Sequence, residues 1–138
     1  MAKLYHFTAA HMIKGCLQDG LTMGCIPVSI DPPVMLPGYQ WLTSNKAFQQ
    51  SWCDPRYSSL PYLRNAFRIT VNIPKSEKKP GGRLIKWLDF LKAAKDEKLL
   101  FAGKILNSCG DPQNWYLFRG TVKKEWFVKV SRNPDELL

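Results

Sequence analysis

The chain has few of the residues that build metal sites and disulfide bonds. Its 138 residues include two histidines and four cysteines, and no two cysteines form a Cys-x-x-Cys pair. Structural zinc sites need about four Cys or His ligands at short spacing. The sequence therefore predicts no metal site, and it indicates reduced, mostly buried thiols at Cys16, Cys25, Cys53 and Cys109.

Acidic residues and long apolar runs are also scarce. Eleven Asp and Glu stand against 20 Lys and Arg, which gives a net charge of +9. This charge favours an anionic partner, whether a nucleic acid, a nucleotide or an acidic protein, without choosing among them. No apolar run approaches the roughly 18–20 residues that cross a bilayer, and the N-terminus has no signal-peptide-like apolar block. We therefore expect a cytoplasmic protein with no membrane partner.

Several common catalytic and phosphate-binding motifs are missing. The sequence contains no G-x-x-x-x-G-K-[ST] loop, no G-x-G-x-x-G and no G-x-S-x-G elbow. A cysteine nucleophile would need a histidine beside it in space, and a sequence does not show such proximity. These absences exclude the commonest nucleotide-binding and hydrolase classes.

What is present indicates one folded domain over residues 1–138. Hydrophobic residues make up 45% of the chain and aromatic residues 12%, enough for a substantial core. Periodicity of two or of 3.6 residues places the elements in the order β-α, loop-β, β, α, β-β. We predict an α+β fold with a bent, mainly antiparallel sheet and two to three helices. The expected strands are 4–8, 39–44, 66–73, 115–119 and 126–130, and the expected helices are 9–19, 84–94 and 97–106.

Residues 24–61 differ from the rest because they contain six prolines, which exclude long regular elements. Within them, 39–44 is expected to be a strand and 45–52 a short helix. A proline-stiffened loop with several aromatic residues in so small a domain is more often a binding feature than a connector.

The opening segment is organised around a histidine. Leu4, His6 and Thr8 alternate with Tyr5 and Phe7, as in a short strand with two faces. Thr8 is suited to cap the helix that follows, and the glycine of the Asp-Gly-Leu segment at 19–21 is suited to end it. His6 is therefore the candidate functional histidine, whereas His11 lies off the apolar stripe of that helix.

The Leu4-Tyr5-His6-Phe7-Thr8 segment, followed by a helix and Asp-Gly-Leu, resembles the first strand and helix of the ADP-ribosyltransferase superfamily. Many members open with a Tyr-His-x-Thr strand and a helix that ends in Gly-Leu. The segment Trp-Leu-Thr-Ser at 41–44 resembles the second signature strand of small bacterial and phage proteins that share this opening. The resemblance covers about a third of the chain by motif. It implies an ADP-ribosyltransferase-like fold and NAD as substrate.

The resemblance also implies roles for single residues. His6 would contact the nicotinamide ribose, the backbone of Phe7 would hold the carboxamide, and Thr8 would hold the end of the strand. Tyr39 and Trp41 are the candidates for stacking on the nicotinamide ring. Hydroxyl contacts would come from Thr43 and Ser44.

In the family a late carboxylate stabilises the positive charge that develops on the ribose, an effect worth several kcal/mol. Glu125, expected to open the last strand, is the candidate, and a salt bridge with the neighbouring lysines is its alternative. Arg68 lies in the middle of an alternating strand, either as a solvated residue or as a charge directed into a cleft. Arg64, Arg68 or Arg119 would replace the carboxylate if the site resembled that of RNA 2′-phosphotransferases.

Two functions of different classes follow from the sequence. The first is transfer of ADP-ribose from NAD to a macromolecular or small-molecule acceptor, as in toxins or anti-defence proteins. The second is a non-enzymatic basic protein that binds nucleic acid or an acidic protein through the aromatic loop and the cations Lys75, Lys78, Lys79 and Arg83. A scaffold with a decayed site is a third alternative.

Overall fold

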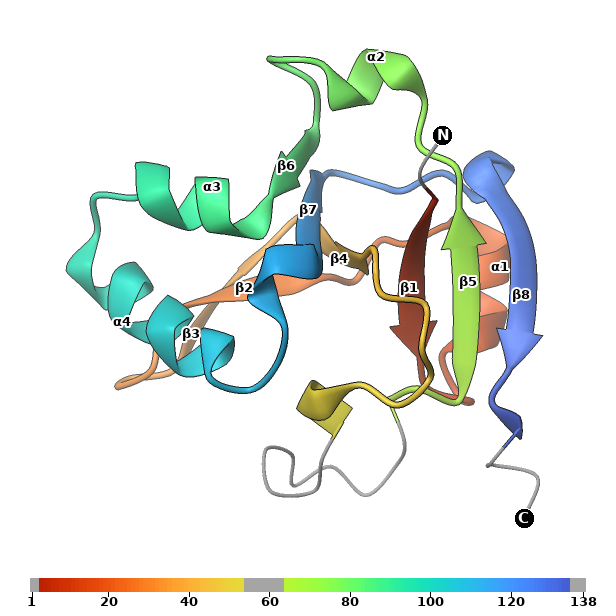
Figure 1. Cartoon of the computed structure of the whole chain (residues 1–138), viewed down its shortest axis with the longest axis horizontal. Coiled ribbons are helices and arrows are strands. Elements are labelled where there is room, and N and C mark those ends of the chain that lie inside the picture. The colour runs from red at the N-terminus through yellow and green to blue at the C-terminus, as the bar shows by residue number, and fades with distance from the viewer. Residues whose placement is uncertain (1–2, 54–63, 135–138) are drawn as a thin grey trace.

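The computed structural model describes residues 3–53 and 64–134, and these residues form an α+β fold around a six-stranded antiparallel sheet (Figure 1). The strand order in this sheet is β6-β7-β4-β1-β5-β8, and β2 and β3 form a separate hairpin. The strands are β1 (Leu4–Thr8), β2 (Cys25–Ser29), β3 (Val34–Pro37), β4 (Tyr39–Thr43), β5 (Phe67–Val71), β6 (Leu84–Lys86), β7 (Trp115–Arg119) and β8 (Phe127–Arg132). The predicted α+β class with an antiparallel sheet is confirmed.

Four α-helices lie in the described residues, whereas two to three were expected. They are α1 (Ile13–Asp19), α2 (Lys75–Lys78), α3 (Trp87–Ala93) and α4 (Glu97–Asn107). Three short 3₁₀ turns accompany them: η1 (Ser51–Cys53), η3 (Pro112–Asn114) and η4 (Lys124–Trp126). The additional helix is α2, a single turn inside the segment that we expected to be a basic loop.

The sheet consists of two halves that meet between β1 and β4. Strands β1 and β5 pair over five consecutive positions, as do β4 and β7. Between β1 and β4 the paired position is Tyr5 with Thr43. In Figure 1, β1, β5 and β8 stand upright side by side while β4 lies to the left of β1 and runs at an angle to them, so the sheet is strongly bent at this junction.

The sheet has two hydrophobic cores, one on each of its faces. On the first face Ile69, Val71 and Phe118 are fully buried beneath α1 and the segment that precedes β8. On the second face Leu117 of β7 and Trp87 of α3 are fully buried between the sheet, the β2–β3 hairpin and α4. Both faces are covered, as expected of a layered α+β domain.

The proline-rich region is more regular than expected. Strands β2 and β3 form a hairpin in which Pro27 lies at a register shift and Pro37 at a strand end. Proline is tolerated at irregular and edge positions because no ladder amide is needed there. The expected helix over 45–52 is wrong, since only the 3₁₀ turn that begins at Ser51 forms.

The expected helix over 84–94 begins later, at Trp87. Leu84 and Ile85 pair with Phe118 and Leu117 of β7, so they extend the sheet before the helix begins. Lys86 keeps an extended backbone at the junction. The predicted strand 66–73 and the predicted helix 97–106 are confirmed to within two residues at each end, as β5 and α4.

Candidate functional site

His6 lies in the middle of β1, where its imidazole bonds to the neighbouring strand. Its Nδ1 is 2.8 Å from the carbonyl oxygen of Trp41 in β4. Because a carbonyl only accepts hydrogen bonds, Nδ1 carries the proton and donates it. The neutral ring therefore has an unprotonated Nε2, and this atom has no hydrogen-bond partner among the described residues. His6 thus offers an acceptor nitrogen in a fixed orientation.

The environment of His6 favours the neutral imidazole. Burial lowers the pKa of His6 below its ordinary value of 6.5, and the bond to the Trp41 carbonyl opposes this effect only in part. The side chain is deeply surrounded by protein atoms yet keeps part of its surface accessible. At neutral pH a neutral ring that accepts through Nε2 can bind a hydroxyl group of a ligand.

Phe7 and Thr8 complete the strand, and their side chains are buried. The Phe7 ring packs edge-to-face on Phe48 and Trp52, with centroids 5.8 and 6.2 Å away. Thr8 lies within 4.0 Å of the Cys16 thiol in α1. Helix α1 begins at Ile13 without a side-chain cap, so the expectation that Thr8 caps it is wrong. These side chains fix β1 in place.

The rings of Tyr39 and Trp41 lie on the face of the sheet opposite His6. Tyr5 pairs with Thr43, so Trp41 shares a face with Tyr5, whereas His6 points to the other side. The Trp41 ring lies 4.9 Å from that of Trp87 and donates its Nε1–H to the Cys25 carbonyl. The Tyr39 ring packs on Phe90 at 5.6 Å. These rings belong to the second core, and only the backbone of Trp41 reaches His6.

Thr43 and Ser44 stabilise the loop after β4. Thr43 Oγ1 accepts the backbone N–H of Asn45 at 3.0 Å, and Ser44 Oγ bonds to Asn114 Oδ1 at 3.0 Å. Asp111 accepts side-chain hydrogen bonds from both Asn45 and Asn114. The two hydroxyl groups that we expected to contact a ligand therefore form hydrogen bonds with groups of the protein itself.

Arg68 lies between two aromatic rings on the same face as Phe7. Its guanidinium lies 5.7 Å from the Tyr5 ring and 4.6 Å from the Phe48 ring. It donates to the Lys46 carbonyl at 2.6 Å and to Ser131 Oγ at 3.4 Å, while its buried Nε has no partner. Arg68 is thus largely engaged by the protein, and its side chain is on the face opposite His6.

Glu125 lies in η4 rather than at the start of β8, and its side chain is exposed. The neighbouring lysines are directed elsewhere: Lys123 lies over the Trp126 ring, and Lys124 donates to the Gln18 carbonyl at 3.1 Å. The described contacts therefore include neither the expected salt bridge nor a link from Glu125 to His6. The histidine and the carboxylate are on separate elements.

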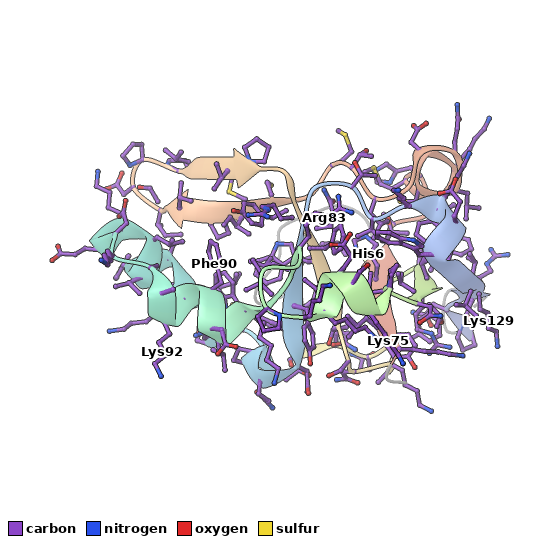
Figure 2. All side chains as sticks on the ribbon, turned by 90° about the horizontal axis from the view of Figure 1, so that it is seen from above. His6, Lys75, Arg83, Phe90, Lys92 and Lys129 are labelled. Carbon is purple, nitrogen blue, oxygen red and sulfur yellow. The ribbon has the colours of Figure 1, made fainter. Side chains whose placement is uncertain are left out.

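A second feature, which the sequence did not indicate, lies on the face of the sheet to which the His6 side chain points. Leu4, two residues before His6, lines a hollow of about 490 Å³ together with Tyr116, Lys86 and the loop after α2. The basic loop was visible in the sequence, but its approach to β1 and β7 depends on long-range pairing. Figure 2 labels His6 in β1, Lys75 in α2, Arg83 in the loop that follows it, and Phe90 and Lys92 in α3.

Comparisons with protein-family models, with curated proteins and with solved structures find no match to this chain. Over residues 3–53 and 64–134, none of the helices is both long and apolar enough to cross a membrane. In the same ranges no three His, Cys, Asp or Glu side chains gather as ligands for a metal ion.

Proposed function

We propose that this chain is an ADP-ribosyltransferase-like protein that binds NAD through His6. The observation that carries the proposal is the fixed orientation of His6, whose Nδ1–H is held by the Trp41 carbonyl while Nε2 remains an acceptor. The resemblance of the strand around His6 to the opening strand of that superfamily supports it further. In such a site Nε2 accepts a hydroxyl group of the nicotinamide ribose.

Transfer of ADP-ribose needs more than binding. The glycosidic bond between the ribose and nicotinamide breaks, nicotinamide leaves with the bonding electrons, and a nucleophile of the acceptor forms a new bond to the ribose while its proton passes to solvent. A carboxylate assists by stabilising the positive charge on the ribose. Glu125 is the carboxylate that we propose to test, and its exposed position in η4 makes NAD binding the better supported half of the proposal.

The alternative of a basic binding protein has less support in the described residues. Arg83, one of its proposed cations, is paired with Glu77 and covers the Phe118 ring at 5.0 Å. Phe48 and Trp52 of the aromatic loop pack inward on Phe7. Binding of nucleic acid is therefore treated as an outcome of the tests.

The test compares three histidine variants by calorimetric titration with NAD and by transfer of labelled ADP-ribose to a bacterial lysate. His6→Asn keeps a donor for the Trp41 carbonyl but removes the Nε2 acceptor, and it should weaken NAD binding by about tenfold or more. His6→Ala should weaken binding and lower stability. The matched control, His11→Asn, should leave NAD binding unchanged.

Glu125→Gln should abolish transfer while NAD binding stays within about twofold, since a residue that acts on the transition state adds little to ground-state affinity. Unchanged NAD binding by His6→Asn, or no NAD binding by the unaltered protein, would refute the proposal. Tight binding of RNA that weakens steeply with salt, in the absence of NAD binding, would favour the alternative instead.

A further inference from the structure

A hollow of about 490 Å³ lies where the loop after α2 faces β6, β7 and the start of β1. Its size falls within the roughly 300–1,000 Å³ of ligand sites, and its composition, apolar with a few charged groups, is typical of them. The residues that line it are the apolar Leu4, Leu84, Ile85 and Tyr116, the charged Lys78, Lys79, Lys86 and Asp89, and the loop residues Pro80, Gly81 and Gly82. In Figure 1 the elements that carry or flank these residues, α2, β6 and the N-terminal end of β1, lie toward the top.

The loop that closes the hollow has a defined conformation. Gly81 adopts a positive φ of 84°, and Gly82 approaches α2 so closely that a Cβ would lie 2.2 Å from the carbonyl oxygen of Glu77. Arg83 then donates from its backbone N–H and its guanidinium to the Glu77 carboxylate, with Nε 3.0 and 3.1 Å from the two oxygens. The two glycines and this ion pair hold the loop against α2.

The residues that line the hollow carry more positive than negative charge, and the Glu77 carboxylate beside them is engaged by Arg83. The Arg83 hydrogen bonds lower the pKa of Glu77, which stays ionised and paired. The residues that line the hollow include three lysines and one aspartate, Asp89. A concave surface lined by an excess of one charge concentrates ligands of the opposite sign. Lysine binds phosphate as a point charge, and the Tyr116 ring offers an aromatic surface for a base.

Leu4, which lines the hollow, and His6 belong to the same strand and lie on the same face of it. Leu4 and His6 are two positions apart in β1, so their side chains point to the same side about 7 Å apart. We infer that the hollow binds the adenosine diphosphate end of a dinucleotide whose other ribose reaches His6. This inference rests on the proposed function, and it assigns Lys79 and Lys86 to the phosphates and Tyr116 with the apolar residues to the adenosine.

The experiment titrates the full chain with ADP, adenosine, inorganic pyrophosphate and NAD at two salt concentrations. The double variant Lys79→Ala/Lys86→Ala is compared with Lys92→Ala/Lys129→Ala, which removes the same charge from exposed residues that do not line the hollow. We expect ADP to bind more tightly than adenosine or pyrophosphate. Its affinity should fall at least tenfold in the first double variant and less than twofold in the second.

The outcomes separate this inference from the proposed function. Equal losses in the two double variants would show a general charge effect and overturn the inference, as would a failure of ADP to bind at millimolar concentration. Tighter binding of a short single-stranded RNA than of ADP would overturn it too. If ADP binding is lost in Lys79→Ala/Lys86→Ala but unchanged in His6→Asn, the result supports an ADP site in the hollow, even if NAD is neither bound nor transferred. If NAD binding requires His6 but not the two lysines, the proposed ADP site in the hollow is refuted, while the proposed function stands.

Discussion

The pH dependence of stability provides a direct test of the neutral, partly buried His6. Burial lowers the pKa of His6 in the folded protein below the value of about 6.5 that it has in the unfolded chain. Between these two values the unfolded chain binds a proton and the folded protein does not. The stability that His6 contributes is therefore complete above pH 6.5 and is lost as the pH falls toward the folded pKa.

The magnitude follows from proton linkage. Where the two states differ by one bound proton, the free energy of unfolding changes by about 1.4 kcal/mol per pH unit. The loss begins near pH 6.5, reaches this slope below it and ends at the folded pKa, beneath which both states are protonated. The bond to the Trp41 carbonyl survives protonation, because Nδ1 donates in both forms, so the loss reflects burial of the charge.

The measurement is urea unfolding of the unaltered protein and of His6→Asn from pH 8 to pH 4.5. Carboxylates such as Glu77 titrate in both proteins, so the difference between the two curves isolates His6. This difference should be flat above about pH 7 and decline below pH 6.5. A flat difference throughout would mean that His6 is not held neutral, and a rise toward acid would mean that the folded protein stabilises the imidazolium.

Three further predictions concern the helices, each measured as a shift in urea midpoint. Gly103→Ala in α4 should lower stability by about 1–3 kcal/mol, because the new Cβ would lie 2.2 Å from two methyl carbons of the buried Leu91. Gly15→Ala in α1, where no atom lies within 4 Å of the new Cβ, should instead raise it by about 0.5–1 kcal/mol. Asp96→Ala should cost about 1 kcal/mol, since this carboxylate accepts two backbone N–H groups of the first turn of α4. Asp19→Ala, at the C-terminal end of α1, serves as its control and should not destabilise.

The elements that were predicted correctly are those whose hydrophobic pattern lies within one continuous segment of the sequence. The alternation around Ile69 and the helical spacing after Asp96 gave β5 and α4 with small errors at their ends. The β2–β3 hairpin is not predicted by the local pattern, because the prolines of this region disfavour long regular elements, although Pro27 fits the hairpin at a register shift. Leu84 was assigned to a helix because its pairing with β7 involves residues more than thirty positions away.

The composition of the site could be predicted only in part. The opening segment indicated that His6 is on a strand, but which rings share its face depends on the pairing of Tyr5 with Thr43. A shift of one residue in that register would move the Trp41 ring to the other face. Register between distant strands is set by long-range packing and not by local composition. The hollow beside Leu4 was missed for the same reason, since the lysines and Tyr116 meet only in the folded chain.

The bend between β1 and β4 has a consequence for how the molecule opens. Tyr5 with Thr43 is the paired position at this junction, whereas the β1–β5 and β4–β7 pairs run over five positions each, so native-state hydrogen exchange should show weaker amide protection at the junction than along those pairs. The bond from His6 to the Trp41 carbonyl fastens this seam beside that position. Loss of the bond would weaken the junction between β1 and β4, and an exposed strand edge is a template for pairing with another chain. The histidine that we propose as a ligand contact therefore also links the two halves of the sheet.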